Sequence, residues 1–434
     1  MASTPRSPRT LSRSDASGHT IGSARVRTHI NETRVMNVSL AVNSRAALMP
    51  AGFLALGTFA IGTEGFMIAP LLPVMAKDFG LPVPTVAVLV IVFTLVLALS
   101  SPISTVATGR MARKWVLLAA MSLFAIGNVT AAVSASFALL IGARVLMAIA
   151  AGLYVPAANG LAGVIVPPSM RGRALAIVSA GQTLAIALGL PLGGMIGHAF
   201  GWRATFLLVG AMSVIAIAGI FAGIARDAGE GVAVASLRER VSVIRQAPIQ
   251  RLLGVSLFWS IGAFAAYPYI AEYLDAVLAF GPNAITATVS LWGLSAAAGV
   301  MTGGVFNDRF GANRVVHGSL MLLGLSFLAL AIASRLPPQV ALVPVLVAVA
   351  VWGFTVWSYF PAQMSRLIAA GAPAQAPVAL ALNTSTMYFG FSVGSTLGAA
   401  VLSSGAVWGI GAVAALAELI ALALNAVLSR NARA

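Results

Sequence analysis

The chain has 434 residues, of which 59% are hydrophobic and 9% are charged, and its formal net charge is +15. About a quarter of the residues of soluble domains are charged, so this composition excludes an ordinary soluble globular protein. The basic residues lie between apolar runs, as membrane orientation requires, which argues against a nucleic-acid-binding protein. No cysteine is present and the four histidines are scattered, which excludes a disulfide scaffold and a metal centre built from local spacing.

Residues 1–48 are polar and basic, and we expect a disordered cytoplasmic tail there. The stretch lacks the early apolar run of a cleaved signal peptide. Its composition, rich in arginine and serine, also fits an organellar transit peptide. A third interpretation is that translation starts at Met36 or Met49, so that residues 1–35 are not part of the native protein.

Twelve apolar segments follow, and runs of this length indicate transmembrane helices. They lie at about residues 49–76, 83–107, 115–135, 138–165, 172–197, 203–224, 252–276, 284–305, 315–334, 339–362, 378–403 and 407–428. The connections are short except at 226–251, which carries five arginines. We therefore predict a six-helix half at 49–225, a cytoplasmic linker at 226–251 with an amphipathic helix at 238–252, and a second six-helix half at 252–430.

The distribution of basic residues predicts the orientation in the membrane. With the N-terminus inside, 22 of the 26 lysines and arginines lie on the cytoplasmic side and three lie outside: Lys77, Arg203 and Arg335. Arg144 falls inside a span. The positive-inside rule therefore places both termini in the cytoplasm of a multi-pass protein of the inner cell membrane.

Short motifs repeat between the halves at an offset of about 200 residues. The loop after the second segment reads Gly109-Arg110-Met111-Ala112-Arg113-Lys114, and the loop after the eighth contains Gly304, Asp308, Arg309, Gly311 and Arg314. The fifth and eleventh segments are rich in small residues, which let helices approach closely in lipid. Pro191 beside Gly189 predicts a weakened helical turn. Two parallel six-helix repeats are typical of secondary transporters that work by alternating access.

Together these motifs resemble the major facilitator superfamily, in particular its twelve-span drug:proton antiporters and their arabinose- or chloramphenicol-efflux-like branch. Loop 109–114 is similar to the family's first signature, with Gly109 at the aspartate position and Ala112 at the glycine position. Arg144 matches the second signature, and the run Gly189-Leu190-Pro191-Leu192-Gly193-Gly194 matches the antiporter signature. The resemblance covers residues 49–428 and implies an all-α integral membrane fold of twelve transmembrane helices in two pseudo-symmetric halves. It assigns conformational roles to Arg110, Arg113, Lys114, Pro191, Gly193, Gly194, Asp308, Arg309 and Gly311.

Glu64 is the one acid well inside the first half, and an acid at the centre of a span is costly and usually functional. We expect it to be a proton site, with Arg144 as its counter-charge or as a substrate-orienting group. The alternatives are a structural acid and an arginine bound to backbone carbonyls. Glu418 is also within a span, where we expect a structural or snorkelled role, and Glu272 and Asp275 are expected to be solvated near the outer face.

The remaining polar and aromatic residues in the spans are candidates for a substrate cavity. We name Phe66, Gln182, Trp292, Asn383 and Tyr388 as candidate lining residues. Most of the aromatic set is nevertheless expected to serve in packing or at the membrane interface. This set comprises Tyr267, Tyr269, Trp292, Trp352, Trp357, Tyr359 and Tyr388.

These observations favour a transporter that exports a small organic molecule in exchange for protons. The alternative of the same fold is a sugar or nucleoside symporter or uniporter. A membrane-embedded enzyme is disfavoured because no catalytic constellation is evident, and a channel because no filter loop is present. We expect no cofactor or metal, the proton gradient as energy source, the lipid bilayer as surroundings, no nucleic-acid partner and a monomer.

Overall fold

The computed structural model describes residues 48–230 and 235–431. Most of the predicted tail therefore lies outside the described residues. Residues 50–434 group as one compact unit, which contains the predicted spans except for Met49 at the start of the first. Within its described part the secondary structure is helical, as the apolar runs predict.

The N-terminal half holds six helical spans, several of them broken near their ends. The first span is a helix over 48–67 continued by η1 (Ala69–Leu71) and α2 (Leu72–Phe79). The others are α3 (Val83–Val86) with α4 (Val88–Ala107), α5 (Arg113–Ala132), α6 (Phe137–Ala162), α7 (Arg171–Leu184) with η3 (Ala185–Gly189) and α8 (Leu190–Phe200), and α9 (Trp202–Gly223). A short η2 (Pro168–Met170) precedes α7.

The C-terminal half repeats this arrangement. Its spans are α11 (Ala247–Ala266) with η4 (Tyr267–Tyr269) and α12 (Ile270–Leu278), α13 (Pro282–Phe310), α14 (Ala312–Ala333), α15 (Pro338–Ala369), α16 (Ala376–Ser403), which follows η5 (Pro373–Gln375), and α17 (Val407–Asn431). The first span of each half breaks at a proline, Pro70 or Pro268. Proline lacks the N–H that would continue the α-helical pattern, so both breaks follow from the sequence.

Eleven helical stretches of the described residues are long and apolar enough to cross a membrane. The predicted segment 378–403 forms α16, which has sufficient length at 28 residues but is not among the eleven. Its run Asn383-Thr384-Ser385-Thr386 lowers its apolarity. The helix lies between α11 and α4, so its polar groups face protein on two sides.

The linker contains a shorter helix than predicted. α10 spans Leu237–Ile244, and two non-helical residues, Arg245 and Gln246, separate it from the start of α11. Pro248 in the first turn of α11 favours a new helix start at that point. Ser236 caps α10 together with Glu239, whose carboxylate accepts from the Ser236 N–H. That hydrogen bond and a second from the Ser236 hydroxyl hold the pKa of Glu239 below its usual value.

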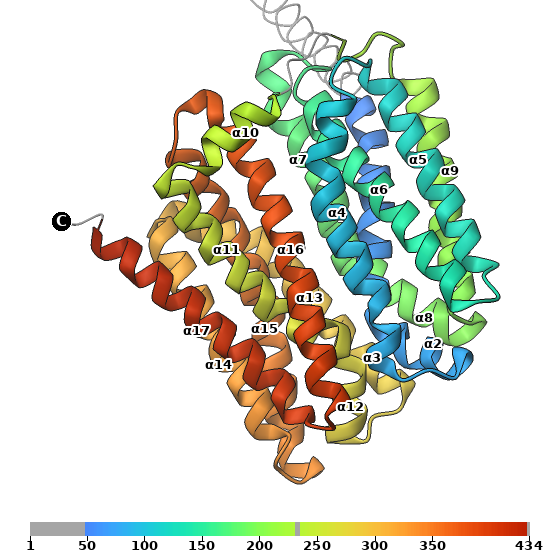
Figure 1. Cartoon of the computed structure of the whole chain (residues 1–434), viewed down its shortest axis with the longest axis vertical. Helices are drawn as coiled ribbons and strands as arrows, with labels where there is room; N and C mark the ends of the chain where they lie inside the picture. The colour runs from blue at the N-terminus through green and yellow to red at the C-terminus, as the bar shows by residue number, and fades with distance from the viewer. Residues whose placement is uncertain (1–47, 231–234, 432–434) are drawn as a thin grey trace, which may run out of the picture. The chain divides into compact units, whose positions relative to one another are not determined.

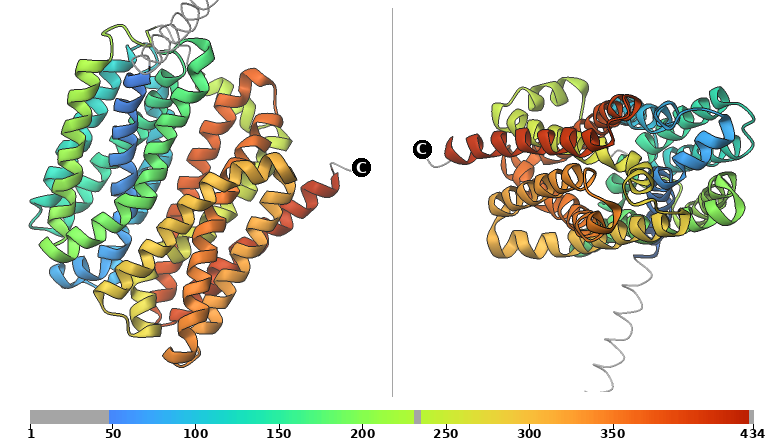
Figure 2. Two further views of the ribbon diagram at one scale, coloured as in Figure 1. Left: turned by 180° about the vertical axis from the view of Figure 1, so that it is seen from behind. Right: turned by 90° about the horizontal axis from the view of Figure 1, so that it is seen from below.

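The two halves meet mainly through three sets of helices. α4 packs against α16, η3 and α8 pack against α13, and η1 and α2 approach η4 and α12. We call the end carrying α2, α3, α8 and α12 the outer end, and the end carrying loop 108–112 and α10 the inner end, after the predicted orientation. The ribbons of the halves diverge toward the inner end (Figure 1), and the view from behind in Figure 2 shows the same arrangement.

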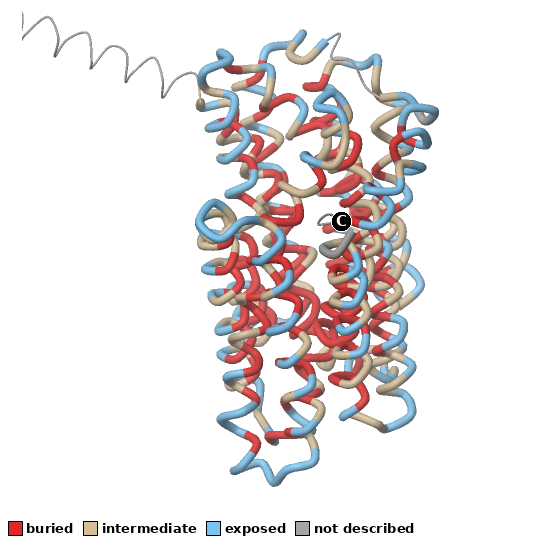
Figure 3. The backbone as a smooth tube through the Cα atoms, turned by 90° about the vertical axis from the view of Figure 1, so that its left-hand side faces the viewer, coloured by how far each residue is buried: buried red, intermediate tan, exposed pale blue. Residues whose placement is uncertain are grey.

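Burial follows the interior of this bundle. Figure 3 shows buried residues along the inside of the helices and exposed ones along the outside and at the ends. Large apolar side chains such as Phe200, Met301 and Met195 are exposed, as expected for surfaces that face lipid.

Candidate functional site

Glu64 and Arg144 form a buried ion pair inside the N-terminal half. Oε1 of Glu64, on the first span, pairs with Nη1 of Arg144 on α6, and both side chains are almost fully buried. Oε2 of Glu64 has no hydrogen-bond partner among the described residues. A buried charge is stable only when it is paired, so each group depends on the other. The structure thus joins the two in-span charges that the sequence singled out.

The second span holds the arginine in place. Nε of Arg144 donates to the carbonyl of Leu89 at 3.1 Å, and its guanidinium lies 4.2 Å from the centre of the Phe93 ring. Both residues belong to α4. Arg144 therefore has a counter-charge and a backbone partner at once, so the two alternatives for this residue coexist. If Glu64 became neutral, Leu89 and Phe93 would still anchor the guanidinium.

Glycines on the fifth span set the position of the first span. A Cβ on Gly189 would collide with Thr63, and one on Gly193 would lie 2.5 Å from Cβ of Met67. The intervening segment η3 is π-helical and stands directly before Pro191. Since proline cannot donate to the carbonyl four residues back, a wider turn forms here, as the weakened turn at Pro191 predicted.

The other face of the fifth span meets the opposite half. A Cβ on Gly194 would lie 3.3 Å from Thr286 of α13, and one on Gly293 of α13 would lie 2.7 Å from the carbonyl of Ile186. The glycine-rich signature thus gives the fifth span close contacts with the first span and with α13. A larger side chain at either face would change how the halves fit together.

Phe66 lies two residues after Glu64 and inserts into a cluster of rings from the C-terminal half. Its ring centre is 5.7 Å from that of Tyr267, 5.9 Å from Trp357 and 6.3 Å from Trp292. The Tyr267 hydroxyl donates to the carbonyl of Phe66 at 2.8 Å, so ring packing and a hydrogen bond join the halves at one residue. We call these four residues the interface aromatic cluster. The Nε1 atoms of Trp292 and Trp357 lack hydrogen-bond partners among the described residues.

The other candidate lining residues are more dispersed. Gln182 lies beside Gly62 of the first span, where an added Cβ would approach its Nε2 to 2.9 Å. Tyr388 reaches the cluster only through other rings, being 5.4 Å from Phe391. Asn383 is fully buried and donates to Sδ of Met387 at 3.1 Å on its own helix, so the structure places it in the packing of α16. Most of the predicted aromatic set is buried, as packing requires.

The first inner loop uses its basic residues as structural anchors. Nζ of Lys114 donates to the carbonyls of Phe221 at 2.7 Å and Ile224 at 2.5 Å, where α9 ends. The Arg113 N–H donates to the carbonyl of Ala228 at the start of the linker. The partners of Arg113 and Lys114 are backbone carbonyls, which sequence motifs do not reveal. Arg110 is exposed.

The second inner loop has a different backbone. Gly311 has φ +84°, a left-handed conformation that favours glycine, whereas Ala112 at the matching position of the first loop has φ −58°. The replacement of glycine by Ala112 is thus accommodated by its backbone. Asp308 and Arg309 are exposed, and neither takes part in an ion pair found within residues 48–230 and 235–431.

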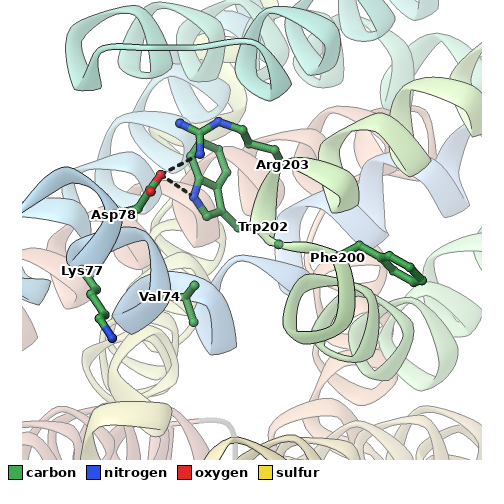
Figure 4. Close-up of a pocket in the computed structure, with 7 residues that line it drawn as sticks. Val74, Lys77, Asp78, Phe200, Trp202 and Arg203 are labelled. Atoms are coloured by element: carbon green, nitrogen blue, oxygen red, sulfur yellow. Dashed lines mark hydrogen bonds and ion pairs between the residues drawn. The ribbon is translucent and has the colours of Figure 1, made fainter.

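A polar cluster at the outer end of the N-terminal half was not predicted. Oδ2 of Asp78 accepts from Nη1 of Arg203 at 2.6 Å and from Nε1 of Trp202 at 3.0 Å, which ties the first span to α9 (Figure 4). Together with Val74, Lys77, Phe200 and Gly201 these residues line an open pocket of about 510 Å³. The predicted outer position of Arg203 was the available sequence signal.

Glu418 is fully buried on α17, which excludes a snorkelled side chain and leaves the structural alternative of that expectation. Neither carboxyl oxygen has a hydrogen-bond partner among the described residues. Asp275 is exposed, as expected, and Glu272 is half-buried.

Comparison with known proteins agrees with this architecture. Residues 54–276 match the Major Facilitator Superfamily. The MFS-type transporter YbcL of Bacillus subtilis (strain 168) is 29% identical over 85% of this chain and 93% of its own. A chloramphenicol resistance protein of Streptomyces lividans is 29% identical over 89% of this chain and 98% of its own. The crystal structure of the nucleoside transporter NupG superposes with a TM-score of 0.69 at 13% identity, covering 88% of this chain and 99% of that one.

The matched family, the relatives and the two six-helix halves lead to one assignment. The transporter relatives also settle that the chain is not an enzyme. With its paired intramembrane charges and helical spans, the chain belongs to the major facilitator superfamily of membrane transporters.

Proposed function

We propose that this transporter exports a small organic molecule in exchange for protons, from an inner cell membrane in which both termini are cytoplasmic. The observation that carries the proposal is the buried Glu64–Arg144 pair. A carboxylate whose single charged partner is an arginine can bind a proton only by giving up that pair. Proton binding at Glu64 therefore leaves Arg144 as a buried charge without its counter-charge inside the N-terminal half.

The arrangement also suggests how proton binding acts on the halves. Glu64 and Phe66 lie on one helix, and Phe66 contacts the interface aromatic cluster. A shift of the first span on protonation would move Phe66 against Tyr267 and its neighbours. In the present arrangement the halves meet at the outer end and Glu64 is paired. For an exporter, this is the state expected after a proton has been released inside and before substrate binds from the inside.

Transport in proteoliposomes tests this proposal, with chloramphenicol as the first probe because a relative is a chloramphenicol resistance protein. We expect Glu64→Gln to retain binding but to lose proton-driven accumulation, and Glu64→Asp to be partly active. Glu272→Gln, at a half-buried acid outside the pair, is the matched control. Undiminished uphill transport by the Glu64→Gln variant would refute a proton role for Glu64. A proton flux in the same direction as the substrate would establish symport instead.

The orientation is tested separately with topology reporters. A reporter fused after Ala434, or inserted within residues 226–251, should be active only in a cytoplasmic assay. The prediction follows from the excess of basic residues on that side. Periplasmic activity at either position would reverse the assignment of inner and outer ends.

A further inference from the structure

Glu418 occupies a place shaped for its carboxyl group between three helices. A Cβ added to Gly262 of α11 would lie 2.6 Å from Oε1 of Glu418, and one added to Gly324 of α14 would lie 3.4 Å from its Cβ. α17 packs along both of these helices. The absence of a side chain at Gly262 thus leaves the space into which the carboxyl group points.

This carboxyl has none of the partners that normally accompany a buried charge. Neither oxygen forms a hydrogen bond or an ion pair with a described residue. The ionisable residues on the helices packed against α17 are Arg251, Arg314, His317 and Tyr388, of which the first three are exposed. An unpaired buried carboxylate is far less stable than the neutral acid. Glu418 is therefore protonated in the packed arrangement.

Tyr359 on α15 begins a chain of hydrogen-bonded side chains that runs toward the inner end. Its hydroxyl is 3.2 Å from Oγ of Ser256, which accepts from Nε2 of Gln363 at 3.0 Å. Gln363 in turn accepts from Nη1 of Arg366 at 3.1 Å. Arg366 is the cation at the inner end of this chain.

We propose that Glu418 is a second proton-binding site, located in the C-terminal half, that holds its proton while α11 and α17 are packed at Gly262 and releases it when they separate. The proton passes to water, the carboxylate keeps the electron pair of the O–H bond, and no further reactant is needed. This second site does not depend on the role proposed for Glu64.

Infrared difference spectroscopy of the reconstituted protein across a pH series tests the site without any substrate. We expect wild type to show a protonated-carboxyl C=O band whose amplitude falls as pH rises, and Glu418→Gln to lack that band. Glu418→Asp, with the carboxyl one methylene shorter, should displace the same band and so keeps the test valid if the Gln variant does not fold. Glu272→Gln should leave the band unchanged.

Gly262→Ala provides a second test through the packing. Its methyl group would press on the carboxyl of Glu418 and on the carbonyl of Ala414, and so push α11 and α17 apart. Because separation of these helices favours release of the proton, we expect the pH at the midpoint of the band's titration to fall by about one unit, a tenfold change in the protonation equilibrium. Gly254→Ala on the same helix is the matched control, because its Cβ would meet Leu424 at an ordinary 3.8 Å. A band of constant amplitude at every pH, or no band lost in Glu418→Gln, would overturn the proposal. A result showing that Glu64 does not titrate would leave the proposal for Glu418 unchanged.

Discussion

The mutual dependence of Glu64 and Arg144 can be measured as a double-mutant cycle on stability. Glu64→Gln leaves the Arg144 cation buried with only Leu89 and Phe93 as partners. Removing one member of a buried pair costs about 3–5 kcal/mol, whereas removing both is often close to neutral. We therefore expect Glu64→Gln to be the least stable variant, and Glu64→Gln with Arg144→Met to recover most of the loss.

The asymmetry between the two single variants is a further part of this prediction. In Arg144→Met the carboxyl of Glu64 can become neutral by binding a proton, while in Glu64→Gln the guanidinium keeps its charge. Glu64→Gln should therefore be destabilised more than Arg144→Met. At about 2–4 °C per kcal/mol, a loss of about 3 kcal/mol in a half of this size lowers the unfolding temperature by about 6–12 °C.

Thermal unfolding of the detergent-purified protein, followed by tryptophan fluorescence, measures the cycle. Asp78→Asn, Arg203→Met and their double variant form a matched control. That ion pair has side chains 41% and 42% exposed, so it should contribute about 0–1 kcal/mol. If the double variant at Glu64 and Arg144 were as unstable as the sum of the single variants, the two residues would not depend on each other and the reasoning would fail.

Two further predictions concern the inner loops. Lys114→Gln should destabilise the N-terminal half by about 2 kcal/mol, because it loses charged hydrogen bonds to the end of α9. Arg110→Gln is the control and should have little effect on stability. Thermal unfolding of the two variants measures the difference. Asp308 is exposed and forms no ion pair with a described residue in this arrangement, so Asp308→Asn should act on the state closed at the inner end, where we expect it to form a partly desolvated ion pair. Its loss should shift the ensemble toward the state open at the inner end, by about tenfold for about 1.4 kcal/mol, whereas Arg110→Ala changes it little. Alkylation of single cysteines placed at the two ends, in a chain without native cysteine, measures that shift; a larger change from Arg110→Ala would contradict the prediction.

The spans and the charges within them were predictable from the sequence, because both depend on the cost of placing polar groups in lipid. Arg144 was expected as the counter-charge of Glu64 only among alternatives, because the distance between two helices far apart in sequence is not encoded in a local pattern. For the same reason, the sequence did not reveal that Leu89 accepts from Arg144 or which carbonyls bind Lys114. Any residue can supply a backbone carbonyl, so no residue type marks such a partner in advance.

Apolarity alone also gave incomplete answers for individual helices. α16 is a full-length helix with a polar run at 383–386, because it packs against protein on two sides. The position of Asn383 within that packing depends on Met387 one turn later, which no cavity pattern would suggest. Breaks caused by proline were predictable at Pro191, where a missing N–H has a local structural effect.

The two buried carboxyls respond to protons in opposite ways. Glu64 is balanced by Arg144, so binding a proton leaves the arginine as a net buried charge. Glu418 has no charged partner among the described residues, so losing a proton creates the uncompensated charge there. Both events oppose the packed arrangement, but at different contacts. In the scheme we propose, Glu64 would act through Phe66 on the interface between the halves, whereas Glu418 would act on the packing of α11 and α17 within one half.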